Sequence, residues 1–527
     1  MRQLGKAIYI ALCLLICAFP FVGMLAGDMG NQTAENRILA SFPQWQTKGK
    51  WNPYFLQELG AYFEDHFALR TLLVAIDANI QSQVFGVSNV DTVTLGEDGW
   101  LYYTASLDDY QGKPALSRRG IANAVHNLSL VQQYVESKGA SFLFAPVPNK
   151  ATLYGTHMPY YIQKREGAAS QWELLKPEIE AARIPYVDLF SLFAGQEETL
   201  YLKRDSHWNQ KGAMLAYRAI MEATGLAHEG YETVKAIRQK DAYGDLSRMI
   251  YPLGNERDWG WASFLKAEPE WEYRYQKENT FQYQTNTKST EEAWIETKGQ
   301  EGQKTLLMSR DSFGNTLLPF LADAFGMGYF SRGEPFRLTE YMDAYQPDVV
   351  ILEKVERELE SLAKAPPLME GLPAESTEDT EDRKGTEDRK DETQDRENKR
   401  EERTGTEEKV GTEEKTGLLE ESAGSISPDG TLEMAESENS IDYWKISGVL
   451  PDAFCTEGAQ ISIRVKDGKE QADYAAFHVT ADTTDYAFCL YLPKENLQED
   501  AVTLEVLVRT EDGLHTVQSA QFPCRVQ

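Results

Sequence analysis

The sequence predicts an α/β domain with a mainly parallel sheet, joined by a charged linker to a small β sandwich. Three observations carry this prediction. Short apolar segments alternate with segments of helical periodicity between about 90 and 360, as in βα units. A stretch after Glu370 is rich in charged residues and has no aromatic residue, and the last part of the chain alternates apolar with polar residues. With 42% hydrophobic residues, the 527-residue chain can bury a large core.

The N-terminal segment, 1–27, predicts a membrane helix. Arg2 and Lys6 precede an uncharged apolar run, Ala7–Ala26, of the roughly 20 residues that a helix needs to cross the hydrocarbon core. The positive residues stand before this run, so a single-pass protein of the cell membrane is expected, with most of the chain outside the cytoplasm. A cleaved signal peptide is the alternative. Met24-Leu25-Ala26 is a poor cleavage site, which favours an uncleaved signal anchor.

Residues 28–90 are predicted to be an exported helical approach segment, because Phe55, Leu59 and Phe63 recur at helical spacing. The following stretch, Val93–Tyr103, contains Asp98-Gly99 at its centre and is expected to form a hairpin.

Residues 91–365 hold the predicted α/β domain, in which helices and strands alternate. The expected helices cover 116–140, 170–184, 209–225 and 315–325, and the expected strands cover 141–148, 185–190, 305–310 and 348–353. Asn209 is the expected first residue of its helix, and Gly139 ends an earlier one as a C-cap would.

Residues 366–440 are predicted to be a disordered charged linker, since they lack the apolar surface that would offset the conformational entropy of folding. The near-repeats are Thr380–Gly385, Thr406–Gly411 and Thr412–Gly417. Residues 441–527 are predicted to form a small β sandwich. Alternating runs at Ile461–Val465 and Val502–Val508 each lead to an Asp-Gly turn. A structural cap, a spacer and a carbohydrate-contacting module remain open as its role.

The overall charge and the cysteine spacing argue against a nucleic-acid-binding protein and a zinc-binding protein. A formal net charge of -30 argues against a nucleic-acid partner, which needs a basic surface. The cysteines of the exported part, Cys455, Cys489 and Cys524, form no CxxC or zinc spacing, so no metal or cofactor is expected. One disulfide with one thiol left over is possible among them, and the pairing stays open.

Asp205 and His207 stand two residues apart. In an extended segment their side chains would share one face, so the carboxylate would reach the imidazole. It would fix the ring tautomer and leave the other nitrogen as a general base. A structural histidine paired with a nearby acid is the alternative. His66 and His157 are weaker candidates for the base, because neither has an acid in the same arrangement.

Ser312 follows an apolar strand and precedes a helical pattern. A serine at such a turn is exposed at the carboxyl edge of the sheet, where its own N–H and the helix N-terminus would stabilise an oxyanion. An ordinary helix cap by Ser312 or Asp311 is the alternative.

Together these motifs resemble the DHHW family and the alginate O-acetyltransferase-like exported proteins, which carry an SGNH-hydrolase-like domain. The residues that carry the resemblance are Asp205-Ser206-His207-Trp208-Asn209 with Gly212, and Asp311-Ser312-Phe313-Gly314. Softer matches in the family's order are Glu35-Asn36-Arg37, Phe63-x-Asp65-x-Phe67-x-x-Arg70, Gly96-x-Asp98-Gly99-Trp100-Leu101, Pro148-Asn149-Lys150 and Val355-Glu356-Arg357.

The resemblance implies O-acetyl transfer to a polysaccharide, with Ser312 as nucleophile, His207 as base and Asp205 as the residue that orients it. It also implies that a multi-spanning membrane acyltransferase supplies the acyl group. A carbohydrate esterase and a non-catalytic, anchored polysaccharide-binding scaffold are the alternatives. The residues expected to line the oxyanion or substrate site are Lys150, Trp208, Asn209, Arg310, Phe313 and Gly314.

Two positions depart from the family pattern. Ser206 replaces the first histidine of Asp-His-His-Trp, and in an extended chain its side chain would point away from its neighbours. Arg310 stands where a glycine commonly precedes Asp-Ser, and its cation could aid an anionic intermediate or crowd it.

Overall fold

The computed structural model describes residues 2–25 and 39–524, apart from 48, 69, 229–230, 232, 252, 254–266, 285, 375–429 and 441. The softer motif Glu35-Asn36-Arg37 therefore lies outside the described residues, as does most of the predicted linker.

A six-stranded sheet lies at the centre of the α/β domain, in the order β5-β12-β10-β11-β9-β8. The four parallel strands are β5 (Ser141–Val147), β12 (Val349–Val355), β10 (Thr305–Ser309) and β11 (Met327–Ser331). The antiparallel strands β9 (Trp294–Lys298) and β8 (Gln282–Tyr283) complete one edge. The prediction of an α/β domain with a mainly parallel sheet is confirmed.

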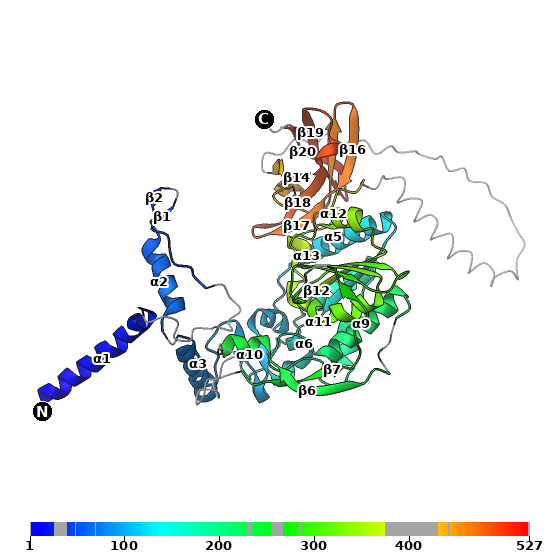
Figure 1. The fold of residues 1–527 in the computed structure, drawn as a ribbon. Helices are drawn as coiled ribbons and strands as arrows, with labels where there is room; N and C mark the ends of the chain where they lie inside the picture. The colour runs from blue at the N-terminus through cyan, green and yellow to red at the C-terminus, as the bar shows by residue number, and fades with distance from the viewer. Residues whose placement is uncertain are drawn as a thin grey trace, which may run out of the picture.

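Helices cover both faces of this sheet, as in a three-layer fold (Figure 1). One face packs against α5 (Arg118–Ser137), α7 (Gln171–Ala181), α12 (Leu338–Tyr345) and α13 (Ser361–Lys364). The other face packs against α8 (Leu189–Ala194), α9 (Gln210–Thr224) and α11 (Gly314–Ala324). Leu306 and Met308 of β10 face the layer of α9 and α11, whereas Leu307 faces the layer of α5 and α7. Burial on both faces explains why the strands read as continuous apolar runs.

One predicted strand, 185–190, is wrong. Tyr186 makes a single parallel bridge to Phe144. The chain then turns into α8, because the side chain of Asp188 accepts a hydrogen bond from the N–H of Ser191 and caps that helix.

The sequence also missed a polar hairpin. Strands β6 (Ala236–Ala242) and β7 (Glu270–Tyr275) pair antiparallel, and α10 (Asp245–Ile250) lies between them in the chain. Most β6 side chains are exposed, so this strand has no apolar alternation to detect.

The N-terminal part contains α1 (Arg2–Leu25), α2 (Phe55–His66) and α3 (Arg70–Ile80). Among the residues that the structure describes, no helix is both long enough and apolar enough to cross a membrane. The predicted hairpin is confirmed by β3 (Val93–Leu95) and β4 (Leu101–Tyr103). Asp98 and Gly99 take positive φ angles of 55° and 78° in its turn. Among the short elements are the strands β1 (Gln46–Thr47) and β2 (Lys50–Trp51) and the helices α4 (Leu107–Tyr110) and α6 (Lys150–Tyr154).

The C-terminal part is a sandwich of two four-stranded antiparallel sheets. The first contains β13 (Thr431–Glu436), β14 (Tyr443–Val449), β18 (Thr484–Pro493) and β17 (Phe477–Ala481). The second contains β16 (Glu470–Ala475), β15 (Gln460–Asp467), β19 (Ala501–Thr510) and β20 (Gly513–Pro523). Their facing apolar side chains form a separate core.

The predicted linker boundaries, 366–440, are too wide at both ends. Glu370 and Pro373 bridge to Tyr491 and Tyr474 of the sandwich, and β13 starts at Thr431. The predicted disorder of the stretch between these ends stays a prediction.

The sandwich packs directly on the α/β domain. In Figure 1, α5 and α13 lie between the central sheet and the sandwich, whereas α9 and α11 lie on the other side of the sheet. The sandwich residues Tyr443, Phe477 and Tyr491 belong to the same apolar cluster as α5 and α7.

Candidate active site

A tight loop between Tyr201 and Trp208 carries the predicted acid and base. Tyr201 and Trp208 form an isolated antiparallel bridge that closes the loop. Inside it, the N–H of His207 donates to Asp205 Oδ1 at 2.9 Å. The segment is therefore a turn rather than the extended strand that the sequence suggested, and the carboxylate reaches the imidazole by folding back on the chain.

The structure brings the three predicted catalytic residues together. Asp205 Oδ1 lies 2.7 Å from His207 Nδ1, and Ser312 Oγ lies 2.8 Å from His207 Nε2. With the Nδ1 proton directed at Asp205, Nε2 is the nitrogen that can accept the hydroxyl proton of Ser312. This hydrogen-bond order is that of a serine nucleophile, its base and an orienting acid.

Asp311 holds the turn that presents Ser312. Its two carboxylate oxygens accept from the N–H groups of Phe313 and Val355, at 2.7 Å each, and its own N–H donates to Glu353. The turn is thereby tied to the carboxyl end of β12. Asp311 supplies the side-chain acceptor of the turn, so the Ser312 hydroxyl remains available to His207.

The charges around His207 favour its protonated form. Burial alone would lower the pKa of His207, but the hydrogen bond to Asp205 and the negative charges of Asp205 and Asp245 outweigh it and raise the pKa above its ordinary value. Burial likewise opposes ionisation of Asp205, yet its contacts with His207 lower its pKa to about 2. Asp205 is therefore ionised wherever the base can act.

Ser206 does not point away from its neighbours, and that expectation is wrong. The side chain is buried, and its Oγ lies 3.2 Å from His207 Nδ1 and donates to Asp245 Oδ2 at 2.5 Å. The cause is the turn conformation of the loop, which removes the two-residue alternation of an extended chain.

The residues expected to line the substrate site are buried, and most of them hold the site in place. Lys150 Nζ donates to the carbonyl oxygens of Leu202, Lys203 and Asp205. Burial lowers the pKa of Lys150 to about 8. The Lys150 ammonium is therefore satisfied by the loop backbone, beneath the acid and the base.

Trp208 and Phe313 connect the two halves of the site. The indole N–H of Trp208 donates to the carbonyl oxygen of Phe313 at 3.2 Å, and the two buried rings pack edge to face. Asn209 caps α9 through Gly212, as predicted, and its side chain also binds the carbonyl oxygen of Thr199. These three side chains position the loop and the turn and do not line a surface.

Arg310 also serves the fold. Its guanidinium donates to Asn315 Oδ1 and to the carbonyl oxygens of Thr290 and Glu292. Gly314 packs on it so closely that an added Cβ would lie 2.8 Å from Arg310 side-chain atoms. These contacts give Arg310 a structural role, and its predicted effect on an anionic intermediate, to aid it or to crowd it, stays a prediction.

Arg357 is a cation beside the site that was not among the predicted site residues. Its guanidinium carbon lies 5.6 Å from the ring centroid of Phe313 and 5.3 Å from that of Tyr103. Its Nε lies 4.0 Å from a carboxylate oxygen of Glu358, and the Arg357 charge lowers the pKa of His207. The signal was present in the motif Val355-Glu356-Arg357.

Asp245 was missed as well. Its Oδ2 lies 3.6 Å from His207 Nδ1, and its N–H donates to Asp205 Oδ2 at 2.9 Å. Within the described part of the chain, Asp205, His207 and Asp245 form a close cluster whose polar atoms are held by hydrogen bonds to one another and to Ser206.

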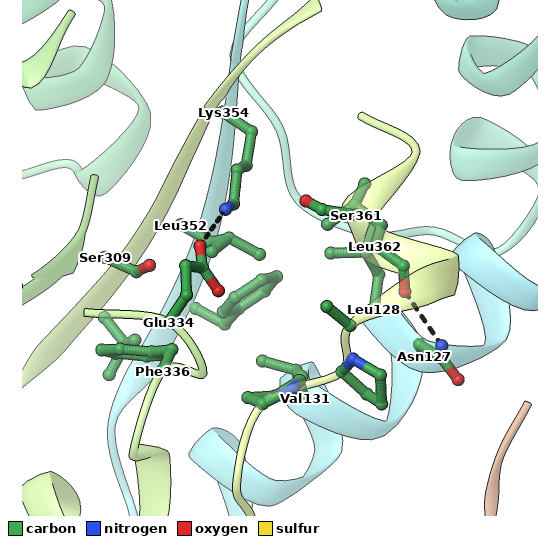
Figure 2. Close-up of a pocket in the computed structure, with 15 residues that line it drawn as sticks. Asn127, Leu128, Val131, Ser309, Glu334, Phe336, Leu352, Lys354, Ser361 and Leu362 are labelled. Atoms are coloured by element: carbon green, nitrogen blue, oxygen red, sulfur yellow. Dashed lines mark hydrogen bonds and ion pairs between the residues drawn. The ribbon is translucent and has the colours of Figure 1, made fainter. Parts of the chain in front are cut away.

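A small apolar cavity of about 40 Å³ lies elsewhere, between α5 and the sheet (Figure 2). Leu128, Val131 and Phe336 line it, and Lys354 pairs with Glu334 at its side. None of the three predicted catalytic residues borders it.

Comparison with known proteins gives a family match. Residues 93–291 match the family described as "SGNH hydrolase-like domain, acetyltransferase AlgX". The chain is 25% identical over 263 residues to the probable alginate O-acetylase AlgJ of Pseudomonas syringae pv. tomato, a match that covers 47% of this chain and 60% of that protein. A second AlgJ, from Pseudomonas putida, is 25% identical over 262 residues, which is 48% of this chain and 61% of that protein.

Two solved structures are also similar. Bacillus cereus PatB1 is 16% identical with a TM-score of 0.40, over 51% of this chain and 96% of that one. A DHHW family protein from Eubacterium siraeum is 16% identical with a TM-score of 0.37, over 51% of this chain and 91% of that one. Over part of its length the chain is therefore similar to alginate O-acetylases and to the SGNH hydrolase-like domain of the AlgX family, the resemblance that its motifs predict, and it spans about 60% of the length of these curated relatives.

Proposed function

We propose that this chain is a membrane-anchored, extracytoplasmic O-acyltransferase that O-acetylates a cell-surface or secreted polysaccharide. The observation that carries the proposal is the continuous hydrogen-bonded order Asp205, His207, Ser312 at the carboxyl edge of the sheet. The matched acetyltransferase family and the relatives named as probable alginate O-acetylases support the choice of acetyl transfer.

The reaction takes place in two steps. His207 Nε2 accepts the hydroxyl proton of Ser312 as Oγ attacks the carbonyl carbon of the donor ester. The leaving group departs with that proton, and the acyl group stays on Oγ. A sugar hydroxyl then attacks the acyl-enzyme, His207 accepts its proton, and the proton returns to Ser312 Oγ as the acetylated sugar leaves. Asp205 stabilises the imidazolium in both steps.

The negative oxygen of each tetrahedral intermediate needs donors. The backbone N–H of Ser312 and the N-terminus of α11, which begins at Gly314, both lie at the turn that carries the nucleophile. Arg357, packed on the Phe313 ring, adds a positive charge on the same side of the domain.

The proposal includes a membrane anchor and a membrane protein that supplies the acyl group. The apolar run after Arg2 and Lys6 would anchor the chain, with the α/β domain outside the cytoplasm. Acetyl-CoA is cytoplasmic, so a multi-spanning membrane acyltransferase would have to pass the acetyl group across and present it to Ser312.

The test uses the purified full chain, an activated acetyl ester and an oligosaccharide acceptor. Acetylated sugar supports transfer, whereas free acetate alone identifies an esterase, and neither product identifies a non-catalytic scaffold. Ser312→Ala should abolish acyl turnover by about 10^4-fold or more, as for serine enzymes whose nucleophile is removed.

Ser141→Ala is the matched control, because Ser141 is an exposed serine at the amino end of β5, at the opposite edge of the sheet. Near-normal turnover in Ser312→Ala, with the fold checked by circular dichroism, would show that Ser312 is not the nucleophile.

A further inference from the structure

The start of α10 packs against the loop between Tyr201 and Trp208, called here the acid–base loop because it carries Asp205 and His207. A Cβ added at Gly244 would lie 2.0 Å from the carbonyl oxygen of Arg204 and 2.8 Å from the N atom of Asp205. The N–H of Ser247 donates to the same carbonyl oxygen at 3.1 Å. The two backbones therefore touch, at a distance that only a glycine at position 244 permits.

This contact delivers a second carboxylate to the base. Asp245 Oδ2 lies 3.6 Å from His207 Nδ1, on the same ring nitrogen that Asp205 contacts at 2.7 Å. Asp245 Oδ1 accepts from the N–H of Ser206 at 2.7 Å, and Oδ2 accepts from the Ser206 hydroxyl. The N–H of Asp245 in turn donates to Asp205 Oδ2.

Two acids thus face one N–H. Asp205 is the closer partner of His207 Nδ1. Asp245 lies farther from this atom and accepts a hydrogen bond from the Ser206 hydroxyl, whose Oγ is itself 3.2 Å from Nδ1. Burial and the charge of Asp205 raise the pKa of Asp245 above its ordinary value, whereas Asp205 is ionised. Both carboxylates lie on the Nδ1 side of the imidazole.

We propose that Asp245 is a positioning residue of the triad: with Ser206 it fixes the imidazole of His207, and it becomes the partner of Nδ1 when Asp205 is removed. The part concerning turnover rests on the proposed function, whereas the part concerning the imidazole does not. A purely structural role, in which Asp245 only anchors α10, predicts no electrostatic effect on His207.

The first experiment follows the titration of His207 by NMR in the full chain with labelled histidine, and it needs no substrate. Asp245→Asn keeps the shape of the side chain and removes its charge. It should shift the His207 midpoint to lower pH by about 0.5 to 1, because a nearby carboxylate favours the imidazolium. Asp241→Asn is the matched control, since Asp241 is an exposed aspartate at the end of β6 that pairs with Arg274.

Equal His207 midpoints in Asp245→Asn and Asp241→Asn would overturn the proposal. This result would stand whether or not the enzyme turns over an acyl ester, so it is distinguishable from failure of the proposed function, which would appear as no turnover in the wild-type chain.

The second experiment measures hydrolysis of the activated ester. Asp205→Ala should retain a residual rate that Asp205→Ala/Asp245→Ala loses by a further tenfold or so. In a triad without a second acid, further changes beside a disabled member cost little, because its members act as one unit. A double variant no slower than Asp205→Ala would show that Asp245 does not replace Asp205.

Discussion

Neighbouring groups affect the pKa of His207 in opposite directions, and in the proposed mechanism its protonation state decides when it can act as a base. Its partners Asp205 and Asp245 stabilise the imidazolium, while burial and Arg357 oppose it. The acids prevail, and the pKa of His207 lies above the ordinary value of 6.5. In the proposed mechanism only the neutral imidazole accepts the Ser312 proton, so a raised pKa of His207 would leave a fraction of the protein inactive near neutrality.

The pH dependence of ester hydrolysis should follow from this balance. We expect kcat/KM to rise with pH through a midpoint above 6.5 and to fall steeply on acidification, because protonated His207 cannot accept a proton. The measurement is the pH–rate profile of the wild-type chain with the activated ester, after subtraction of the buffer-catalysed rate. An ascending limb centred below 6.5 would contradict the charge balance around His207.

At the residue scale the sequence predicted the partners but not their geometry. Asp205, His207 and Ser312 meet as expected, because each belongs to a short motif with a local chemical logic. The predicted direction of the Ser206 side chain was wrong, since the loop is a turn, and Ser206→Ala should disturb both His207 and Asp245. Asp245 could not be predicted, because it reaches the site only through the tertiary contact at Gly244.

At the scale of elements, burial decided which strands the sequence revealed. Strands β5, β10 and β12 are covered on both faces, so their apolar runs are unmistakable. The exposed β6 has no such signal, although the segment that follows it carries α10 to the acid–base loop. The predicted strand at 185–190 failed because Asp188 begins a helix inside an apolar run.

The contact between α10 and the loop can be tested at its closest point. Gly244→Ala places a Cβ 2.0 Å from the carbonyl oxygen of Arg204, so backbone must move and Asp205 should move with it. A shift of about 1 Å in a catalytic group can cost about 100-fold in rate, and we expect a loss of that order in ester hydrolysis.

The matched control for this substitution is Gly60→Ala on α2, where an added Cβ has no atom within 4 Å. Melting curves of both variants separate a local effect from unfolding. Equal activity in the two variants would show that the loop does not depend on α10.

At the scale of the whole molecule, the sandwich and the α/β domain are not independent. Asn127 of α5 donates to the carbonyl oxygens of Leu362 and His478, and it accepts from the N–H of His478. The rings of His126 and His478 stack at 3.8 Å in the same interface. Burial lowers the pKa of both histidines, so neutral rings pack between the two parts.

This interface changes the expectation for a chain without its sandwich. From the sequence alone, deleting the β domain should leave ester cleavage largely intact, since no predicted catalytic residue lies in it. The shared core shows that the deletion would expose the apolar face of α5 to water, which favours aggregation of the truncated chain. Cutting the linker is therefore a better test than deletion.

Limited trypsin digestion should cut the lysine- and arginine-rich stretch within 375–429 and leave both flanking parts intact, because its composition cannot support a core. The two fragments should still co-elute in size-exclusion chromatography and retain ester hydrolysis, since the interface between α5 and β17 holds them together. Asn127→Ala should promote their separation, whereas Gln133→Ala, on the exposed side of α5, should not.

A protected fragment spanning 375–429 would show that the linker is folded. Fragments that part at once without denaturant would show that the interface contributes little, and the ordered contacts at Glu370 and Pro373 would then depend on the intact chain.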